Sequence, residues 1–212
     1  MLAPTISRWE NAPSLRDLIR LMGVMVALYC ASYPAPPEAV TLDIDDTVDV
    51  VHGHQQLSLF NAHYDERCFL PIHVYDTATS RPVAVLLRPG KTPSGIEIRG
   101  HLRRLVRRIR RHWPQTRITI RGDGHYGRRE AMDWCEQNRV HYIFGLSTNT
   151  ILAAQVFAKT DEVCVRRAIG NLDVVRDYTE TRYGAKSWSH PRRVVARIEA
   201  TRKGLDLSLI HI

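Results

Sequence analysis

The sequence is poor in cysteine and has no long hydrophobic run. Its four cysteines lie far apart and form no Cys-x-x-Cys pair, which argues against a zinc knuckle or a disulfide framework and favours a reducing compartment. The most apolar stretch, residues 21–31, is too short to cross a bilayer and predicts a buried helix. The first residues show neither the basic start nor the apolar core of a signal peptide. We therefore expect a cytoplasmic protein that does not contact a membrane.

Common ligand-binding motifs are also missing. The basic loop 87–95 lacks the G-x-x-x-x-G-K-[ST] spacing of a P-loop. The histidines show no H-E-x-x-H or comparable metal-binding spacing, so we expect them to be polar strand-end or surface groups. His125 is the best exception, because it lies two residues after Asp123 and could approach a scissile phosphate. The histidines considered are His52, His54, His63, His73 and His125.

Basic residues outnumber acidic ones. The 212 residues include 30 Lys and Arg against 22 Asp and Glu, which gives a formal net charge of +8. With 44% hydrophobic and 25% charged residues, the composition is that of an ordinary globular protein, long enough for one sizeable core and part of a second unit. The positive charge favours a polyanionic partner.

The first half of the sequence predicts one helix followed by strands. A motif like a capping box at Ser14 and Asp17 begins a helix that runs to about Ala31. The proline-rich segment 33–38 then ends it. Strand-like segments follow, and the short polar turn before the last of them predicts a hairpin. These segments are 41–51, 68–75 and 82–88.

Helices then alternate with strands. Apolar residues spaced by three and four positions from Ile98 to Trp113 predict an amphipathic helix. The remaining core segments are a strand at 116–122, a helix at 128–138, a strand at 140–146 and a helix at 149–159. Residues 161–212 show no clear helical period and carry short strand-like pieces at 162–167, 181–188 and 193–201.

This order of segments predicts the fold class. A three-stranded antiparallel meander followed by helix–strand alternation is typical of an RNase H-like fold, although other α/β folds also combine sheet and helix layers. We therefore expect an α/β protein in three parts. They are an N-terminal helical segment and linker (1–37), an RNase H-like catalytic core (38–160) and a β-rich region (161–212).

Aspartates interrupt the first strand-like segment. Because alternate residues of a strand share a face, Asp43 and Asp45 should point the same way. Asp123 follows the strand 116–122, at the kind of strand end where open α/β sheets place reactive groups. If the two strands are neighbours, Asp45 and Asp123 can share a cation, and hard oxygen ligands select Mg²⁺ or Mn²⁺. Two such ions can activate a water or a 3′-hydroxyl for phosphodiester cleavage. Asp46 and Asp49 are better explained as strand-end and turn residues.

A phosphatase is the first alternative. Residues 43–48, DIDDTV, match the D-x-D-x-T-V signature of haloacid dehalogenase-like phosphatases, in which Asp43 would be the nucleophile and Asp45 the acid/base. However, the chain returns after this strand as another strand, whereas that family needs a crossover to a parallel one. The turn after Asp123 also lacks a second acid four residues on, and a helix rich in arginine has no role in a small-molecule phosphatase.

Arginines cover the polar face of the helix that begins near Ile98. The planar guanidinium suits phosphate, so this face can contact several DNA phosphates and make affinity depend on salt. A non-catalytic DNA-binding module is therefore a second alternative. The predicted DNA-binding residues are Arg103, Arg104, Arg107, Arg108 and Arg111 on the helix, with Arg88 and Lys91 in the preceding loop.

Several blocks, taken in order, resemble the DDE-type insertion-sequence transposases of bacteria, in particular those whose RNase H-like core is interrupted by a β-rich insertion. The resemblance covers roughly residues 4–206. Its blocks are LDIDDT (42–47), HG-x-Q-x-LSLFN (52–61), LRPGKTPSG (87–95), the arginine-rich helix, RGDGHYGR (121–128) and YIFGL (142–146).

The resemblance implies a site and a reaction. Asp45 matches the first catalytic carboxylate and Asp123 the second, with Asp43 as the alternative for the first. The family's activity is cleavage at transposon ends with two Mg²⁺ (or Mn²⁺) ions in the complete site, followed by strand transfer from the freed 3′-hydroxyl. Its partners are double-stranded DNA, both transposon ends and target, and a second copy in a homodimer of the full-length protein. A DNA substrate places such a protein at the nucleoid.

One part of the family pattern is missing from the sequence. The family's third acid is a Glu on a helix beyond the β-rich insertion, and no residue here matches it. Glu162, Glu180 and Glu199 all fall in the region predicted as strands. The tail 205–212 no longer resembles the family. We therefore expect an internal fragment or truncated copy of a longer transposase, ending at the start of the insertion and with little or no strand-transfer activity alone.

Overall fold

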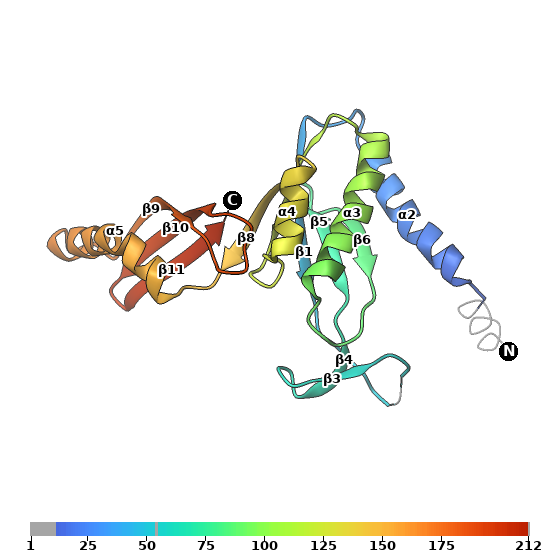
Figure 1. The fold of residues 1–212 in the computed structure, drawn as a ribbon, viewed down its shortest axis with the longest axis horizontal. Helices are drawn as coiled ribbons and strands as arrows, with labels where there is room; N and C mark the ends of the chain where they lie inside the picture. The colour runs from blue at the N-terminus through green and yellow to red at the C-terminus, as the bar shows by residue number, and fades with distance from the viewer. Residues whose placement is uncertain (1–11, 54, 212) are drawn as a thin grey trace. The chain divides into compact units, whose positions relative to one another are not determined.

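The computed structural model describes residues 12–53 and 55–211, and the chain separates into two compact units. The first unit comprises Met1–Thr92 and His101–Ile118, and the second comprises Pro93–Gly100 and Thr119–Ile212. The first contains α2 (Leu15–Ala31), β1 (Ala39–Asp46), β2 (Asp49–Val50), β3 (Leu59–Asn61), β4 (Glu66–Phe69), β5 (Ile72–Asp76), β6 (Pro82–Leu86) and most of α3 (Gly95–His112) (Figure 1).

The second unit contains the remaining helices and strands. These are most of β7 (Arg117–Gly122), then α4 (Arg129–Gln137), β8 (His141–Leu146), α5 (Thr150–Ile169), β9 (Val174–Tyr183), β10 (Arg192–Thr201) and β11 (Gly204–His211). One eight-stranded sheet has the order β6-β5-β1-β7-β8-β11-β10-β9, and a smaller sheet has the order β2-β4-β3.

The predicted meander is confirmed in the first unit. β1 pairs antiparallel with β5, and β5 pairs antiparallel with β6 across the predicted hairpin. The first two predicted strands are each interrupted, however, because β2, β3 and β4 form the smaller sheet instead. Pro71 lies between β4 and β5. A proline cannot donate a hydrogen bond to a strand ladder, so it separates the two strands.

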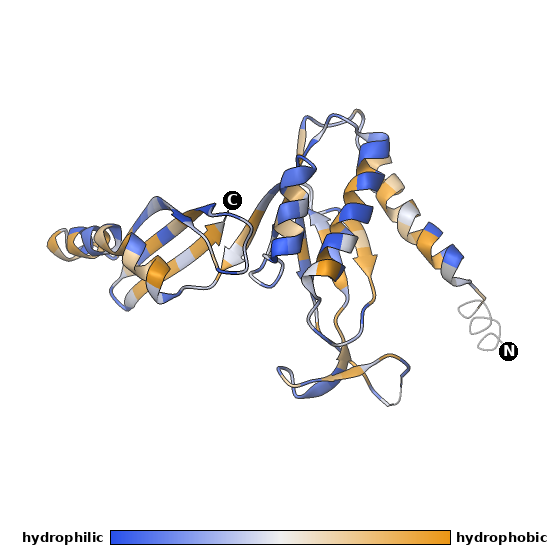
Figure 2. Ribbon diagram, in the orientation of Figure 1, coloured by the Kyte–Doolittle hydropathy of each residue, from blue (hydrophilic) through white to orange (hydrophobic). Residues whose placement is uncertain are grey.

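The predicted amphipathic helix is confirmed as α3. Its apolar positions are buried, among them Leu102, Val106 and Ile109, and Trp113 directly after the helix is buried as well. Figure 2 shows the hydrophilic colouring of the arginine-bearing part of the helix. The spacing of three and four residues that predicted the helix therefore corresponds to the face that is removed from water.

The N-terminal helix begins where the sequence predicts but is not buried. The amide of Asp17 donates to the Ser14 hydroxyl, and the Asp17 carboxylate accepts from the Ser14 amide, which completes the capping box. Several apolar side chains of α2 nevertheless lie at the surface, and the hydrophobic residues of the helix are coloured orange in Figure 2. The prediction of a buried helix is wrong, because α2 packs against β6 and meets Arg108 of α3 but leaves a row of apolar side chains uncovered. The exposed side chains are Leu18, Ile19, Leu21, Val24 and Leu28.

A buried carboxylate fastens α2 to the hairpin of β5 and β6. Asp76, 1% exposed, accepts hydrogen bonds from the hydroxyls of Tyr29 and Tyr33. It also accepts from the Thr79 hydroxyl at 3.0 Å and the Ala78 amide at 2.9 Å. Every one of these donors favours the charged form of the carboxylate.

We expect Asp76→Asn to destabilise the first unit more at neutral than at acidic pH. Burial raises the pKa of Asp76, but the hydrogen bonds from the two tyrosines, Thr79 and Ala78 outweigh it and hold the pKa below its ordinary value of 3.8. A lowered pKa stabilises the fold above the unfolded pKa, and this stability is lost as pH falls through the folded pKa. Urea unfolding should show a loss of about 1–3 kcal/mol at pH 7 that shrinks at an acidic pH well below 3.8. An equal loss at both pH values would contradict this role.

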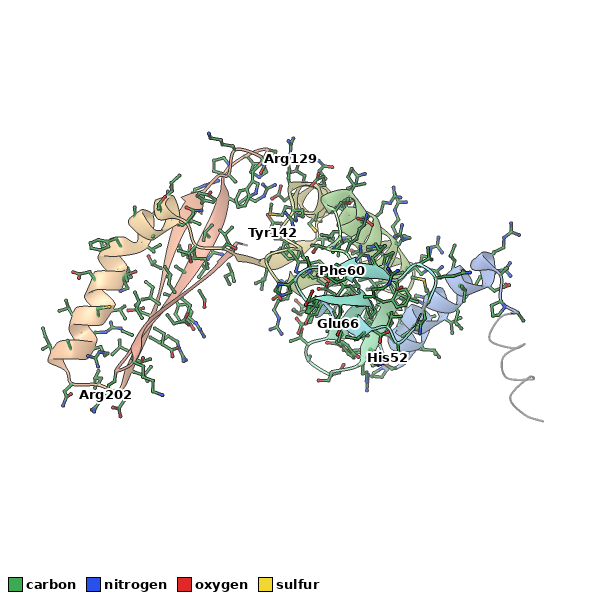
Figure 3. The ribbon with its side chains drawn as sticks, turned by 90° about the horizontal axis from the view of Figure 1, so that it is seen from below. His52, Phe60, Glu66, Arg129, Tyr142 and Arg202 are labelled. Carbon is green, nitrogen blue, oxygen red and sulfur yellow. The ribbon has the colours of Figure 1, made fainter. Side chains whose placement is uncertain are left out.

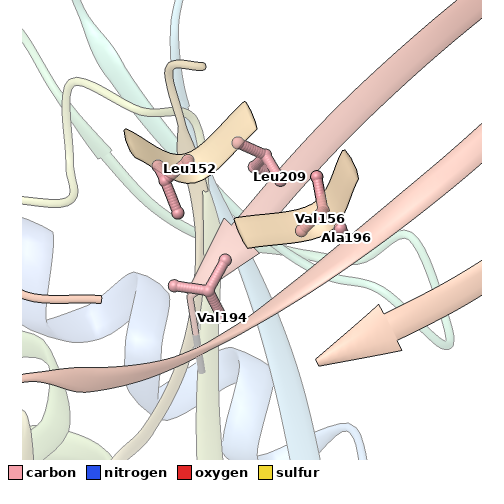
Figure 4. Close-up of a cluster of buried hydrophobic side chains, with 5 residues drawn as sticks. All are labelled: Leu152, Val156, Val194, Ala196 and Leu209. Carbon is pink, nitrogen blue, oxygen red and sulfur yellow. The ribbon is translucent and has the colours of Figure 1, made fainter. Parts of the chain in front are cut away.

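In the second unit, α5 covers one face of the sheet formed by β9, β10 and β11. Figure 4 shows the central cluster of this contact, in which Leu152 and Val156 of α5 meet side chains of β10 and β11. A second cluster joins Val163 to the far end of the same strands. The strand partners in the first cluster are Val194, Ala196 and Leu209.

The helix α5 corrects one strand prediction. It extends to Ile169, so residues 162–167 are helical and not a strand. The β-branched residues Val163 and Val165 favour strands when considered alone. Burial of Leu152, Val156 and Val163, spaced by four and seven positions, shows that the helical period continues through this segment. Glu162 therefore lies on a helix.

No helix within the described residues is both long and apolar enough to span a bilayer.

Candidate functional site

The first candidate acids lie on β1, on the face away from the core. Val40, Leu42 and Ile44 are buried, whereas Asp43 is half-buried and Asp45 is exposed. The alternation confirms that the two aspartates share a face. The Asp45 carboxylate accepts a hydrogen bond of 2.8 Å at Oδ1 from the amide of Asp46, which orients it at the end of the strand.

Two aromatic side chains lie opposite these aspartates on β5. In the antiparallel register His73 faces Asp45 and Tyr75 faces Asp43, and directly paired residues project from the same face of a sheet. The two rings are stacked, with centroids 6.4 Å apart and an interplanar angle of 18°. The sequence predicted His73 only as a polar strand-end or surface group. Its position opposite Asp45 was not predicted, because it depends on the register between β1 and β5.

Asp123 lies in the second unit, exposed in the turn that follows β7. Its carbonyl accepts a hydrogen bond of 3.0 Å from the amide of the buried Tyr126. The turn also lies close to β8, because a Cβ on Gly145 would come within 3.0 Å of the Gly124 amide. His125 is half-buried and its ring packs against Tyr126, with centroids 4.0 Å apart. Backbone contacts thus hold Asp123 in a defined turn.

The structure divides the predicted DNA-binding residues into two groups. Arg108 donates from Nη2 to the Ile19 carbonyl of α2 at 3.4 Å, and its guanidinium occupies the space where a Cβ on Gly23 would lie. Arg88 is 4% exposed and donates to the Lys91 carbonyl at 3.4 Å. These two arginines hold α2 and the loop, respectively. The exposed members of the set are Lys91, Arg103, Arg104, Arg107 and Arg111.

A cluster that sequence analysis missed lies in the second unit. Asp133, Glu136 and His190 place potential metal-ligand atoms within 4.8 Å of one another. Arg192 bridges the two carboxylates, with Nη2 2.6 Å from Asp133 and Nε 2.7 Å from Glu136. Tyr142, labelled in Figure 3, donates a hydrogen bond of 2.6 Å to Glu136. The spacing of Asp133 and Glu136 on one helix face is visible in the sequence, but their distant partner is not.

The electrostatics of this cluster favour an ion-pair role. Burial raises the pKa of Asp133, but hydrogen bonds from Ser189 and Arg192 outweigh it and lower this pKa. Burial likewise raises the pKa of Glu136, but hydrogen bonds from Arg192 and Tyr142 outweigh it and lower that pKa as well. Both groups are therefore charged at neutral pH and offset the charge of Arg192, whose side chain is 2% exposed. A divalent ion would have to displace a buried guanidinium, so the donor set fits a cation such as Mg²⁺ poorly.

The fold of the chain is similar to that of a solved transposase. The chain is similar to the piggyBac transposase in its synaptic complex with hairpin DNA, with a TM-score of 0.53, 11% identity and coverage of 98% of this chain. This likeness confirms the predicted RNase H-like fold. The chain spans 39% of that piggyBac chain.

The chain belongs to the family described as Transposase DDE domain group 1, whose model matches residues 2–211. The predicted family is therefore confirmed. The match includes residues 205–211 of the tail, so the expectation that the tail departs from the family is wrong. In the structure this tail forms β11, which pairs with β8 and β10. Family membership, together with the antiparallel pairing of β1 and β5, also removes the basis for the phosphatase alternative.

Two further solved structures are less similar. The Mos1 strand transfer complex has a TM-score of 0.33 and 14% identity, with coverage of 71% of this chain and 46% of that chain. The intasome of simian T-cell lymphotropic virus in complex with PP2A regulatory subunit B56 gamma has a TM-score of 0.36 and 10% identity, with coverage of 97% and 93%. No curated protein matches the chain.

Proposed function

We propose that the chain contributes Asp45 and Asp123 to the metal site of a DNA transposase, with Asp43 as the alternative first acid. The observation that carries the proposal is the position of the two acids at strand ends: Asp45 lies near the end of β1 and Asp123 directly after β7. In the strand order of this DDE-family chain, β1 is followed by β7. Both carboxylates are exposed and have the oxygen chemistry that Mg²⁺ or Mn²⁺ prefers.

The bound ions, two in the complete site, would supply Lewis-acid activation of a water or 3′-hydroxyl and of the leaving oxygen. The residues of this chain would hold and orient them. The amide of Asp46 fixes the Asp45 carboxylate, and the turn from Asp123 to Tyr126 fixes the second acid. The substrates are double-stranded transposon ends and target DNA, bound by a homodimer of the full-length protein at the nucleoid.

The third acid is proposed to lie outside this chain. Each glutamate considered for it is already paired with a cation: Glu162 with Lys159, Glu180 with Arg193 and Glu199 with Arg176. A carboxylate that is already paired with a cationic side chain is poorly suited to hold a metal ion as well. We therefore expect little or no strand transfer by the chain alone, and full cleavage activity of the purified chain would contradict this assignment.

Iron-directed cleavage of the protein tests whether Asp45 and Asp123 share an ion. Fe²⁺ replaces Mg²⁺ at oxygen sites, and with ascorbate and peroxide it generates hydroxyl radicals that cut the backbone nearby. We expect cuts near residues 45 and 123 together, with both suppressed by excess Mg²⁺. Cuts near only one of the two would contradict the shared site. Cuts near Asp133 and His190 would assign the ion to the Arg192 cluster instead.

The exposed arginines of α3 are proposed to bind DNA phosphates. We expect the triple variant Arg103→Gln, Arg107→Gln, Arg111→Gln to bind every DNA sequence more weakly. The slope of log affinity against log salt should fall by about 0.9 for each phosphate that the variant no longer neutralises. Fluorescence anisotropy at several salt concentrations measures this slope. The matched control is Arg108→Gln, which should loosen α2 in thermal unfolding without changing the slope, and an unchanged slope in the triple variant would refute the DNA-binding role.

A further inference from the structure

The stacked pair of His73 and Tyr75 has no role in the site described so far. Along β5, Ile72, Val74 and Asp76 are buried, so the two rings project from the opposite face. Tyr75 remains 42% exposed. The register of β5 with β6 shifts between Val74 and Tyr75, and an irregularity of this kind re-aims a side chain. The strand therefore presents two nearly parallel rings on this face, with His73 half-buried and Tyr75 exposed.

The position of these rings relates them to the candidate acids. Tyr75 is paired with Asp43 and His73 with Asp45, and directly opposite residues have Cβ atoms about 4.5–5.5 Å apart. The two rings thus run alongside both carboxylates, one ring beside each. Successive same-face positions on a strand are about 6.6–6.8 Å apart, so a polynucleotide that lies along β1 passes both rings.

We propose that Tyr75, supported by His73, forms a stacking site for an unpaired nucleobase next to the Asp43–Asp45 face. This inference rests on the proposed function, because that function brings a DNA strand to these carboxylates. Aromatic rings stack on bases irrespective of sequence, since every base has a π-face. A paired base inside a duplex is already stacked on both sides, so the ligand is a base that has left the helix, or one at a single-stranded end.

The chain contains a matched aromatic pair with a different geometry. His63 and Tyr64 are also a histidine and a tyrosine in contact, and Tyr64 is 40% exposed. Their rings meet edge to face, at an interplanar angle of 78°, and lie in the turn after β3, away from the register of β1. The exposure of the two tyrosines and the composition of the two pairs are thus nearly equal, while Tyr75 differs from Tyr64 in its parallel stack and in its pairing with Asp43 across the sheet.

Binding of labelled DNA tests the proposal. A single-stranded oligonucleotide carrying 2-aminopurine, whose fluorescence falls on stacking, is titrated with the chain in EDTA, and the same label is used in a duplex. We expect Tyr75→Leu to weaken single-strand binding about tenfold and to abolish the fluorescence loss, with duplex affinity unchanged. Tyr75→Phe should behave as the unmodified chain, and Tyr64→Leu should have no effect.

Several outcomes would overturn the stacking site. These are equal losses for single strand and duplex, the same loss in Tyr75→Phe and Tyr75→Leu, or an equal loss in Tyr64→Leu. If Tyr75→Leu unfolds, His73→Leu takes its place and should reduce both binding and fluorescence loss. Because the titration contains EDTA, it is independent of the metal site. Failure of stacking with intact iron-directed cleavage rejects this inference alone, whereas failure of that cleavage rejects the proposed function.

Discussion

Asp45→Asn should lower the affinity of the chain for Mn²⁺ by about 100-fold or more. Loss of an outer-shell partner of a metal ligand already costs about 10–100-fold in affinity, and this substitution removes a charged ligand itself. Asp123→Asn should have a similar effect if the two carboxylates hold the same ion. Titration calorimetry, or the electron paramagnetic resonance signal of free Mn²⁺, measures both affinities. The double variant should be little worse than either single one, because residues that act as a unit are not additive.

The controls for this prediction lie on the same segment. Asp49→Asn changes an exposed aspartate of β2 and should leave Mn²⁺ affinity unchanged. Asp43→Asn decides which carboxylate is the first acid, because a larger effect there than at Asp45 would transfer the role. If wild-type protein binds DNA but no Mn²⁺, and Asp45→Asn and Asp123→Asn leave DNA affinity unchanged or slightly higher, the chain is a non-catalytic DNA-binding module.

Arg192→Leu should destabilise the second unit by about 3–5 kcal/mol, because breaking a buried ion pair leaves an uncompensated charge. The Arg192 side chain is almost fully buried and joins Asp133 and Glu136 of α4 to the start of β10. It also lies over the Trp188 ring, with 5.3 Å between the guanidinium carbon and the ring centroid. After the substitution the two carboxylates lose their shared buried cation, and Asp133 keeps only the more exposed Arg129, 3.3 Å away. Urea unfolding followed by tryptophan fluorescence measures the change, since Trp188 is part of the cluster.

The neighbouring residue provides the control. Arg193 pairs with Glu180, and both side chains are at least half exposed. Arg193→Leu should therefore change the unfolding free energy by only about 0–1 kcal/mol. Acidification should weaken the wild-type chain toward the Arg192→Leu level, because the lowered pKa values of Asp133 and Glu136 make their contribution disappear as pH falls through them. Equal effects of the two arginine substitutions would show that Arg192 is not a structural ion-pair centre.

The comparison of sequence with structure separates local from distant contacts. The capping box of α2, the amphipathic face of α3 and the shared face of Asp43 and Asp45 follow from spacings of two to four residues, and the structure confirms each. The strand predicted at 162–167 failed because β-branched residues favour strands locally, while packing of Val163 against β10 and β9 favours the helix. Exposure of α2 could not be predicted, because it depends on which other elements pack against the helix.

For the candidate site, the sequence alone determined which aspartates end strands and which helix face carries arginines. Only the tertiary structure decided that His73 lies opposite Asp45, that Arg108 serves α2, and that Arg192 joins α4 to β10. The physical reason is the range of the interactions. Periodicity and capping act within one or two turns of backbone, whereas strand register and buried ion pairs join residues that are dozens of positions apart and acquire their partners only when the chain folds.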